Sequence, residues 1–135
     1  MVIPKGLRYS EDHLWVEVDG DKATIGITDF AQSWLGELIS LDLFEVGSKI
    51  EQRGLFGILE TTKVSFELYS PVGGTIIKRN NDLLDQITLI NREPYEGGWM
   101  IALGMRSTQD LGDLMDADGY REYIKKWRFE EEGDQ

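Results

Sequence analysis

The stretch that decides the fold is ETTKVSFELYSPVGG, residues 60–74. Its Val, Phe, Leu and Tyr side chains are typical of a strand that buries one face, and such strands turn at Gly, Asn, Asp or Pro. Here Lys63 stands where the chain has to turn. The pattern therefore predicts a β-hairpin that holds Lys63 at its tip, on backbone kept rigid by the two strands below.

Short strand-like runs fill the rest of the first hundred residues. They are separated by turn residues at 19–22, 46–48, 70–71 and 80–82. Many short strands at close spacing predict a sandwich or a barrel, so we expect a mainly β protein. The predicted strands cover residues 15–18, 23–27, 37–43, 54–60, 64–69, 75–78 and 99–103.

Helical patterns interrupt and follow the strands. Thr28-Asp29 is a suitable N-cap for a short helix over residues 30–35, and Gly36 stands at the position of a C-cap glycine. Residues 83–98 show weak periodicity and are expected to form a surface loop. After Arg106, a capping pattern at Ser107 and apolar residues at helical spacing predict two short helices that pack across the β core. We expect one domain over residues 1–129 and a charged, flexible tail over residues 130–135.

The composition narrows the class of protein. The 135 residues include 25 acidic and 14 basic side chains, for a formal net charge of −11. Such a surface repels phosphate and disfavours nucleic acid as a ligand. A basic protein partner fits the charge better, but from the charge alone simple solubility is the preferred interpretation. Cysteine is absent, which excludes disulfides and thiol nucleophiles, and no apolar run approaches the length of a membrane span. The first residues show no signal-peptide pattern, so we expect a cytoplasmic protein that does not contact membranes.

Several motifs recur in a fixed order around the hairpin. They are YSEDHLW (9–15), ATIGITDFAQSWL (23–35), EVG (45–47), PY (94–95) and GW (98–99), with Glu60, Lys63 and Gly74 framing the tip. In this order they resemble the H-protein family of the glycine cleavage system, whose members are lipoyl carriers. The resemblance covers nearly the whole chain, from about residue 7 to about residue 123.

The resemblance implies a barrel-sandwich hybrid, the two-sheet fold of lipoyl domains, with a short internal helix and C-terminal helices. It also implies lipoic acid joined by an amide to Lys63 and a monomeric carrier without catalytic residues. A lipoyl-attachment enzyme would read Glu60 and Gly74. The side chains implied to line or flank the groove around the arm are His13, Leu14, Phe66 and Glu67, and His13 is expected on the surface near Lys63.

One position departs from the family pattern. Between His13 and Trp15 the family normally has Glu, whose carboxylate is understood to hold the amino group of an aminomethyl intermediate, whereas this chain has Leu14. Leucine cannot pair with an ammonium group. We therefore place the H-like lipoate-binding proteins of heterodisulfide-reductase-like sulfur oxidation narrowly ahead as the match. The alternative is glycine cleavage, with glycine decarboxylase, aminomethyltransferase and dihydrolipoyl dehydrogenase as clients.

Three other functions are weaker fits to the sequence. His13 with Glu11 and Asp12 could form a metal site, but zinc sites usually have more nitrogen or sulfur ligands, so we expect no metal. Ser10 near His13 is at best part of a hydrolase triad. A β-rich adaptor without cofactor would have no need for Lys63 at a hairpin tip.

The four tryptophans lie within apolar runs and are expected to pack in the core.

Overall fold

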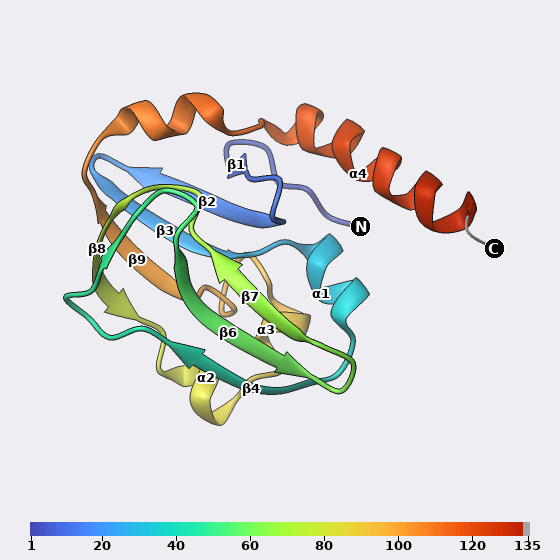
Figure 1. Cartoon of the computed structure of the whole chain (residues 1–135), viewed down its shortest axis with the longest axis horizontal. Coiled ribbons are helices and arrows are strands. Elements are labelled where there is room, and N and C mark those ends of the chain that lie inside the picture. The colour runs from blue at the N-terminus through green and yellow to red at the C-terminus, as the bar shows by residue number, and fades with distance from the viewer. Residues whose placement is uncertain (134–135) are drawn as a thin grey trace.

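Two antiparallel sheets make up most of the molecule in a computed structural model that describes residues 1–133, with side chains through Trp127 (Figure 1). Within these residues the first sheet has the strand order β1-β2-β3-β9-β8-β5. Its strands are β1 (Arg8–Tyr9), β2 (Leu14–Asp19), β3 (Lys22–Ile27), β5 (Lys49–Ile50), β8 (Gly74–Arg79) and β9 (Ile101–Met105). The second sheet has the order β4-β6-β7. Its strands are β4 (Leu38–Leu43), β6 (Leu55–Thr61) and β7 (Ser65–Tyr69). The predicted mainly β, two-sheet fold is confirmed.

The predicted strands all have counterparts in the structure. Strands β2 and β3 pair from Leu14↔Ile27 to Asp19↔Lys22, which confirms the hairpin expected around residues 19–22. Strands β6 and β7 pair from Leu55↔Tyr69 to Glu60↔Ser65, so the hairpin predicted around Lys63 is present as well. The sequence did not predict β1 and β5, because each has only 2 residues and shows no alternation.

The side chains between the sheets form the main core. It includes residues from both sheets, such as Leu14 and Ile25 from the first and Phe56 and Leu59 from the second, each at 0% exposure. A second apolar cluster is separate from the main core. Its members are Ile3, Tyr9, Trp15, Phe30, Ala117, Tyr120 and Ile124. The second cluster joins the N-terminal segment, α1 and the first turns of α4 to the sheet, next to the candidate site described below.

The short internal helix is where the capping pattern predicted it. Helix α1 (Asp29–Leu35) begins after Thr28, whose side chain accepts a hydrogen bond from the N–H of Ala31. It ends at Gly36, which has a φ of 72°, a left-handed conformation that glycine adopts without a Cβ penalty. The helix buries Phe30, Ala31 and Leu35 and leaves Trp34 on its outer side.

The expectation of a loop over residues 83–98 is wrong. This segment contains α2 (Asp82–Asp85) and α3 (Leu89–Arg92), each a single turn. Leu83 and Ile90 anchor these turns because both side chains are buried in the main core. One helical turn is too short to produce a periodic pattern, which explains why the sequence did not reveal it.

The C-terminal region forms a 3-10 helix and one long helix instead of two short helices. Ser107 caps η1 (Thr108–Asp113) as predicted, by accepting from the N–H of Gln109. Helix α4 (Ala117–Gly133) packs beside β1 through its first turns and then extends past α1 (Figure 1). It includes residues 130–133 of the predicted tail, whereas Asp134 and Gln135 lie outside the described residues.

A single domain over residues 1–129 and a flexible tail after it both remain predictions. No helix among the described residues combines the length and the apolar character needed to span a membrane.

Candidate functional site

Lys63 lies at the tip of the β6–β7 hairpin and is exposed. The turn is held by Thr61, whose buried Oγ1 accepts hydrogen bonds from the N–H groups of Lys63 (3.1 Å) and Val64 (2.9 Å). The Thr62 N–H also donates to the Glu37 carbonyl, at 3.2 Å, on the neighbouring segment. The backbone on both sides of the lysine is therefore fixed, while its side chain is exposed.

Glu60 and Gly74, the predicted recognition residues, occupy different environments. Glu60 is close to the tip, and both of its carboxylate oxygens lie 2.8 Å from the Ser65 hydroxyl, which donates to them. Gly74 is buried at the start of β8 in the other sheet. A Cβ at this position would lie 2.2 Å from the carbonyl oxygen of Gly104, so the close approach of β8 to β9 requires glycine here.

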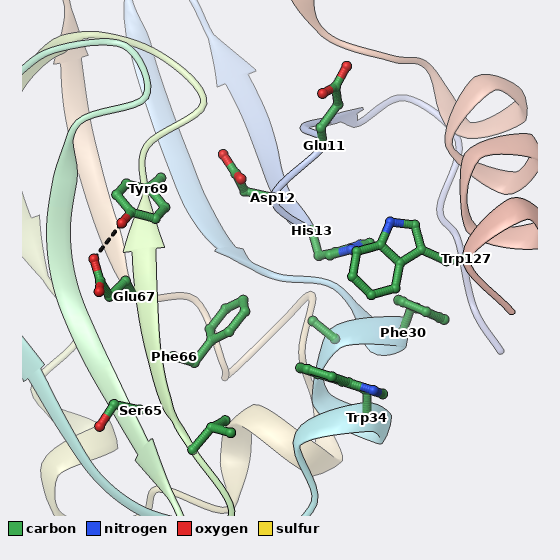
Figure 2. Close-up of a pocket in the computed structure, with 12 residues that line it drawn as sticks. Glu11, Asp12, His13, Phe30, Trp34, Ser65, Phe66, Glu67, Tyr69 and Trp127 are labelled. Carbon is green, nitrogen blue, oxygen red and sulfur yellow. Dashed lines mark hydrogen bonds between the residues drawn. The ribbon is translucent and has the colours of Figure 1, made fainter. Parts of the chain in front are cut away.

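A groove of about 440 Å³ lies beside the hairpin (Figure 2). One wall is β7, an edge strand of the second sheet. The opposite wall comes from the β1–β2 turn, α1 and α4. Its lining combines aromatic rings with polar and acidic side chains. The aromatic members are Phe30, Trp34, Phe66, Tyr69 and Trp127, and the polar members include Glu11, Asp12, His13, Ser65 and Glu67.

Lys63 lies next to this groove. A second hollow of about 310 Å³ is lined by Lys63, Val64 and residues of α1, and it shares Val64 and Trp34 with the groove. The ammonium of Lys63 points toward α1, since a Cβ on Gly36 would be 4.0 Å from Nζ. The hollow beside Lys63 and the groove therefore adjoin at Trp34 and Val64.

His13, in the β1–β2 turn, links the wall of the groove to α4 and, through Tyr120, to the start of α1. Its backbone has a φ of 69°, a left-handed conformation that is uncommon for residues other than glycine. Nδ1 is hydrogen-bonded to the Tyr120 hydroxyl of α4 at 2.9 Å, and that hydroxyl is 2.7 Å from Thr28 Oγ1, the N-cap of α1. Among the described side chains, His13 Nε2 is the buried polar atom that has no hydrogen-bond partner.

Burial controls the charge of His13. The side chain is 8% exposed, and the rings of Phe30, Tyr123 and Trp127 surround it at centroid distances of 5.1, 5.6 and 5.1 Å. Because burial penalises the charged imidazolium, it lowers the pKa of His13 to about 4. The imidazole is neutral at pH 7, so it adds no positive charge to the groove.

The other charges on the groove are negative. Glu67 accepts a short hydrogen bond from the Tyr69 hydroxyl, which raises the pKa of Tyr69. Burial raises the pKa of the Asp12 carboxyl, and nearby Arg53 opposes this shift. Within the described part of the chain, no lysine or arginine lines the groove. The site therefore combines apolar walls with a negative rim.

The structure corrects three expectations from the sequence. Leu14 does not line the groove, because its side chain is fully buried in the main core at the start of β2. His13 lines the groove but is buried rather than on the surface. Trp34 and Trp127 are not core residues: they are 43% and 39% exposed and meet at the groove, with ring centroids 6.3 Å apart.

Phe66 and Glu67 line the groove, where the resemblance placed them. The sequence did not single out Phe30, Trp34, Trp127 or Tyr120, which come from α1 and α4. Their meeting depends on how the C-terminal helix packs, and no spacing along the chain reports it. No group of three or more His, Asp or Glu side chains in the described region is arranged to hold a metal ion.

Comparison with known proteins gives a consistent result. The family described as "Glycine cleavage H-protein" matches residues 7–127. The glycine cleavage system H protein of Brevibacillus brevis is 48% identical over 126 residues, covering 93% of this chain and 100% of the relative. The Bacillus subtilis protein of the same name is 46% identical, covering 93% and 99%.

A solved structure agrees with these matches. The crystal structure of a glycine cleavage system H protein from Mycobacterium marinum superposes with a TM-score of 0.81 at 30% identity and covers 92% of this chain and 98% of that one. Proteins of this family carry lipoyl-lysine and are non-catalytic carriers. The chain belongs to the glycine cleavage H-protein family.

Proposed function

We propose that this protein is the lipoyl carrier of a glycine cleavage system, with the lipoyl group joined by an amide to Lys63. In this role it receives an aminomethyl intermediate at one enzyme and presents it to the next. The protein itself supplies the attachment point, a groove for the loaded arm and surfaces for docking.

The observation that carries the proposal is the position of Lys63 beside the groove. The lysine is exposed at a rigid tip, and the apolar groove begins at its neighbours Val64 and Trp34. The residues present suit the cofactor, because the lipoyl arm is a hydrocarbon chain that ends in two sulfur atoms and aromatic walls bind such a chain well. An exposed Lys63 is also accessible to an attachment enzyme.

Bound at Lys63, a lipoyl group supplies the sulfur atoms that take up and release the intermediate. The residues of this chain do the rest. Thr61 fixes the direction in which Lys63 leaves the hairpin, and Phe66 and Trp34 provide apolar surface on opposite sides of the arm's path. Tethering keeps the arm at a high effective concentration at any enzyme on which the domain docks.

Two observations favour glycine cleavage over sulfur oxidation as the client. The relatives named above are glycine cleavage H proteins. The case for sulfur oxidation depended on Leu14 as a groove residue without charge, but Leu14 is buried in the core and Glu11, Asp12 and Glu67 provide carboxylates at the groove. The groove is therefore able to accept an ammonium group despite Leu14.

The partners follow from this proposal. They are a lipoyl-attachment enzyme, for which Glu60 is placed beside the tip, and the glycine decarboxylase, aminomethyltransferase and dihydrolipoyl dehydrogenase of the system. The net charge of −11 favours basic docking surfaces on these enzymes, because complementary charges speed association. We also propose that the carrier acts as a monomer.

The test is the intact mass of the lipoylated protein, with its lipoyl group in the oxidised disulfide form, before and after incubation with glycine decarboxylase and glycine. We expect a lipoyl mass on the protein, an added aminomethyl mass after incubation, and neither in Lys63→Arg. Lipoylation without an aminomethyl gain, from a decarboxylase that loads a control H protein, would favour the sulfur-oxidation client. Absence of any lipoyl mass in the presence of a competent ligase would refute the carrier function.

A further inference from the structure

We propose that Trp34 and Trp127 form an aromatic cation site in the groove, and that this site holds the ammonium group at the end of the loaded arm. The inference rests on the proposed function, because it concerns the intermediate that the arm carries. It goes further by assigning the binding of the positive charge to two tryptophans, one on α1 and one on α4 (Figure 2).

The two tryptophans leave part of their indole surface exposed at the groove. Their rings meet in an edge-to-face geometry, with an interplanar angle of 77°, and both side chains are more than a third exposed although they lie at the groove. The face of tryptophan binds a cation better than that of any other side chain. Large exposed indoles that are not needed for core packing therefore have a chemical use at this position.

The chain holds Trp127 in place independently of any ligand. Its Nε1 donates to the Tyr123 hydroxyl at 3.2 Å, and its ring meets the ring of His13 edge-to-face at 84°. Tyr120, one turn before Tyr123, is bonded to both His13 and Thr28. The docking of α4 thus fixes the orientation of Trp127 over the groove.

The titratable groups around the site favour a cation as well. Glu11, Asp12 and His13 face the groove from the β1–β2 turn, and Glu67 and Tyr69 face it from β7. The three carboxylates attract an ammonium group, and neutral His13 does not repel it. A neutral or anionic head group would gain nothing from this combination. The ligand class that fits is an alkylammonium at the end of an apolar chain.

The arm can be loaded without any enzyme, which allows a direct test. One thiol of the reduced lipoyl group reacts with formaldehyde and ammonia to form a carbon–sulfur bond to an aminomethyl group, and one water molecule leaves. No oxidant or reductant is needed. With ¹³C-formaldehyde, the new methylene carbon gives an NMR signal whose shift reports the protonation of the neighbouring amine, and Lys63→Arg provides the background from other adducts.

The measurement is the pKa of this amine in the lipoylated protein and in matched variants. Trp127→Leu and Trp34→Leu keep apolar volume but remove the indole face, whereas Trp127→Phe keeps an aromatic face. Trp99→Leu is the control, because Trp99 lies outside the groove. Circular dichroism and thermal melting establish that each variant is folded.

A cation held by the indoles predicts that each Leu variant lowers the amine's proton affinity about two- to fivefold. Trp127→Phe should restore much of this loss, and Trp99→Leu should cause none. If the tryptophans only excluded water, their removal would raise the amine pKa, because desolvation disfavours the charged form. An increase or no change in the Leu variants therefore overturns the cation site. Absence of a lipoyl mass on Lys63 would overturn the proposed function, and this inference with it.

Discussion

Gly74→Ala separates a structural role of Gly74 from direct recognition by an attachment enzyme. In the structure Gly74 is buried between β5 and β9, paired with Ile50 and Met105. An added Cβ would lie 2.2 Å from the carbonyl oxygen of Gly104, 2.9 Å from its carbonyl carbon and 3.1 Å from Met105 Cα. All three atoms belong to the backbone, so no side-chain rotation can relieve the overlap, and β8 and β9 must move apart.

Overpacking of this kind costs about 1–3 kcal/mol. For a chain of this size, each kcal/mol lowers the melting temperature by roughly 3–6 °C. We therefore expect Gly74→Ala to melt roughly 3–18 °C below the wild type in calorimetry. Gly104→Ala is the matched control in the same strand pair, because its Cβ would have Ile77 Cγ2 as nearest neighbour at 3.6 Å, an ordinary contact. That variant should melt within about 3 °C of the wild type.

The rate of lipoylation then distinguishes the two roles. At a temperature where Gly74→Ala is fully folded, the structural role predicts the wild-type rate of lipoylation. The reason is that β8 and the β6–β7 tip lie on opposite sides of the molecule (Figure 1). A rate that falls in the folded variant would show that the attachment enzyme reads Gly74 itself. A wild-type melting temperature for Gly74→Ala would refute the packing argument.

Three further predictions concern the tip and the buried network. Lys63→Arg should carry no lipoyl mass and melt within about 2 °C of the wild type, because the exposed tip contributes little packing; a large loss of stability would contradict its placement. Thr61→Val leaves the N–H groups of Lys63 and Val64 without their shared acceptor. It should cost about 1–3 kcal/mol in denaturant unfolding and slow lipoylation; wild-type stability would show that the turn does not need Thr61. Because burial lowers the pKa of His13 from 6.5 to about 4, the unfolded chain binds the proton more readily. The free energy of unfolding should therefore decrease as the pH falls from about 6.5 to about 4, by up to about 3 kcal/mol from this group. The free energy of unfolding of His13→Gln should depend less steeply on pH over that range. An identical pH dependence in the wild type and the variant would contradict the assignment.

Local sequence patterns predicted the elements that are specified by residues close together in the sequence. The hairpin around Lys63, the β2–β3 hairpin and the cap at Thr28 follow from alternation, turn residues and a capping side chain within a few positions of one another. The one-turn helices α2 and α3 could not be predicted, because Leu83 and Ile90 hold them to a core built from distant strands. The last helix was expected to be short, but α4 runs from Ala117 to Gly133, and Asp116 caps its first turn by accepting a hydrogen bond from the Gly119 N–H.

The sequence by itself determined that Lys63 stands at a hairpin tip, because the strands and turn residues that place it there are neighbours in the sequence. Only the tertiary structure decided which side chains face that lysine. It placed Leu14 in the core, although its position in the sequence suggested the groove. It also brought Trp34 and Trp127 together from α1 and α4, 6.3 Å apart between ring centroids. The reason is physical: a hairpin is specified by neighbours in sequence, whereas the walls of a groove depend on how separate elements bury their apolar faces against a shared core.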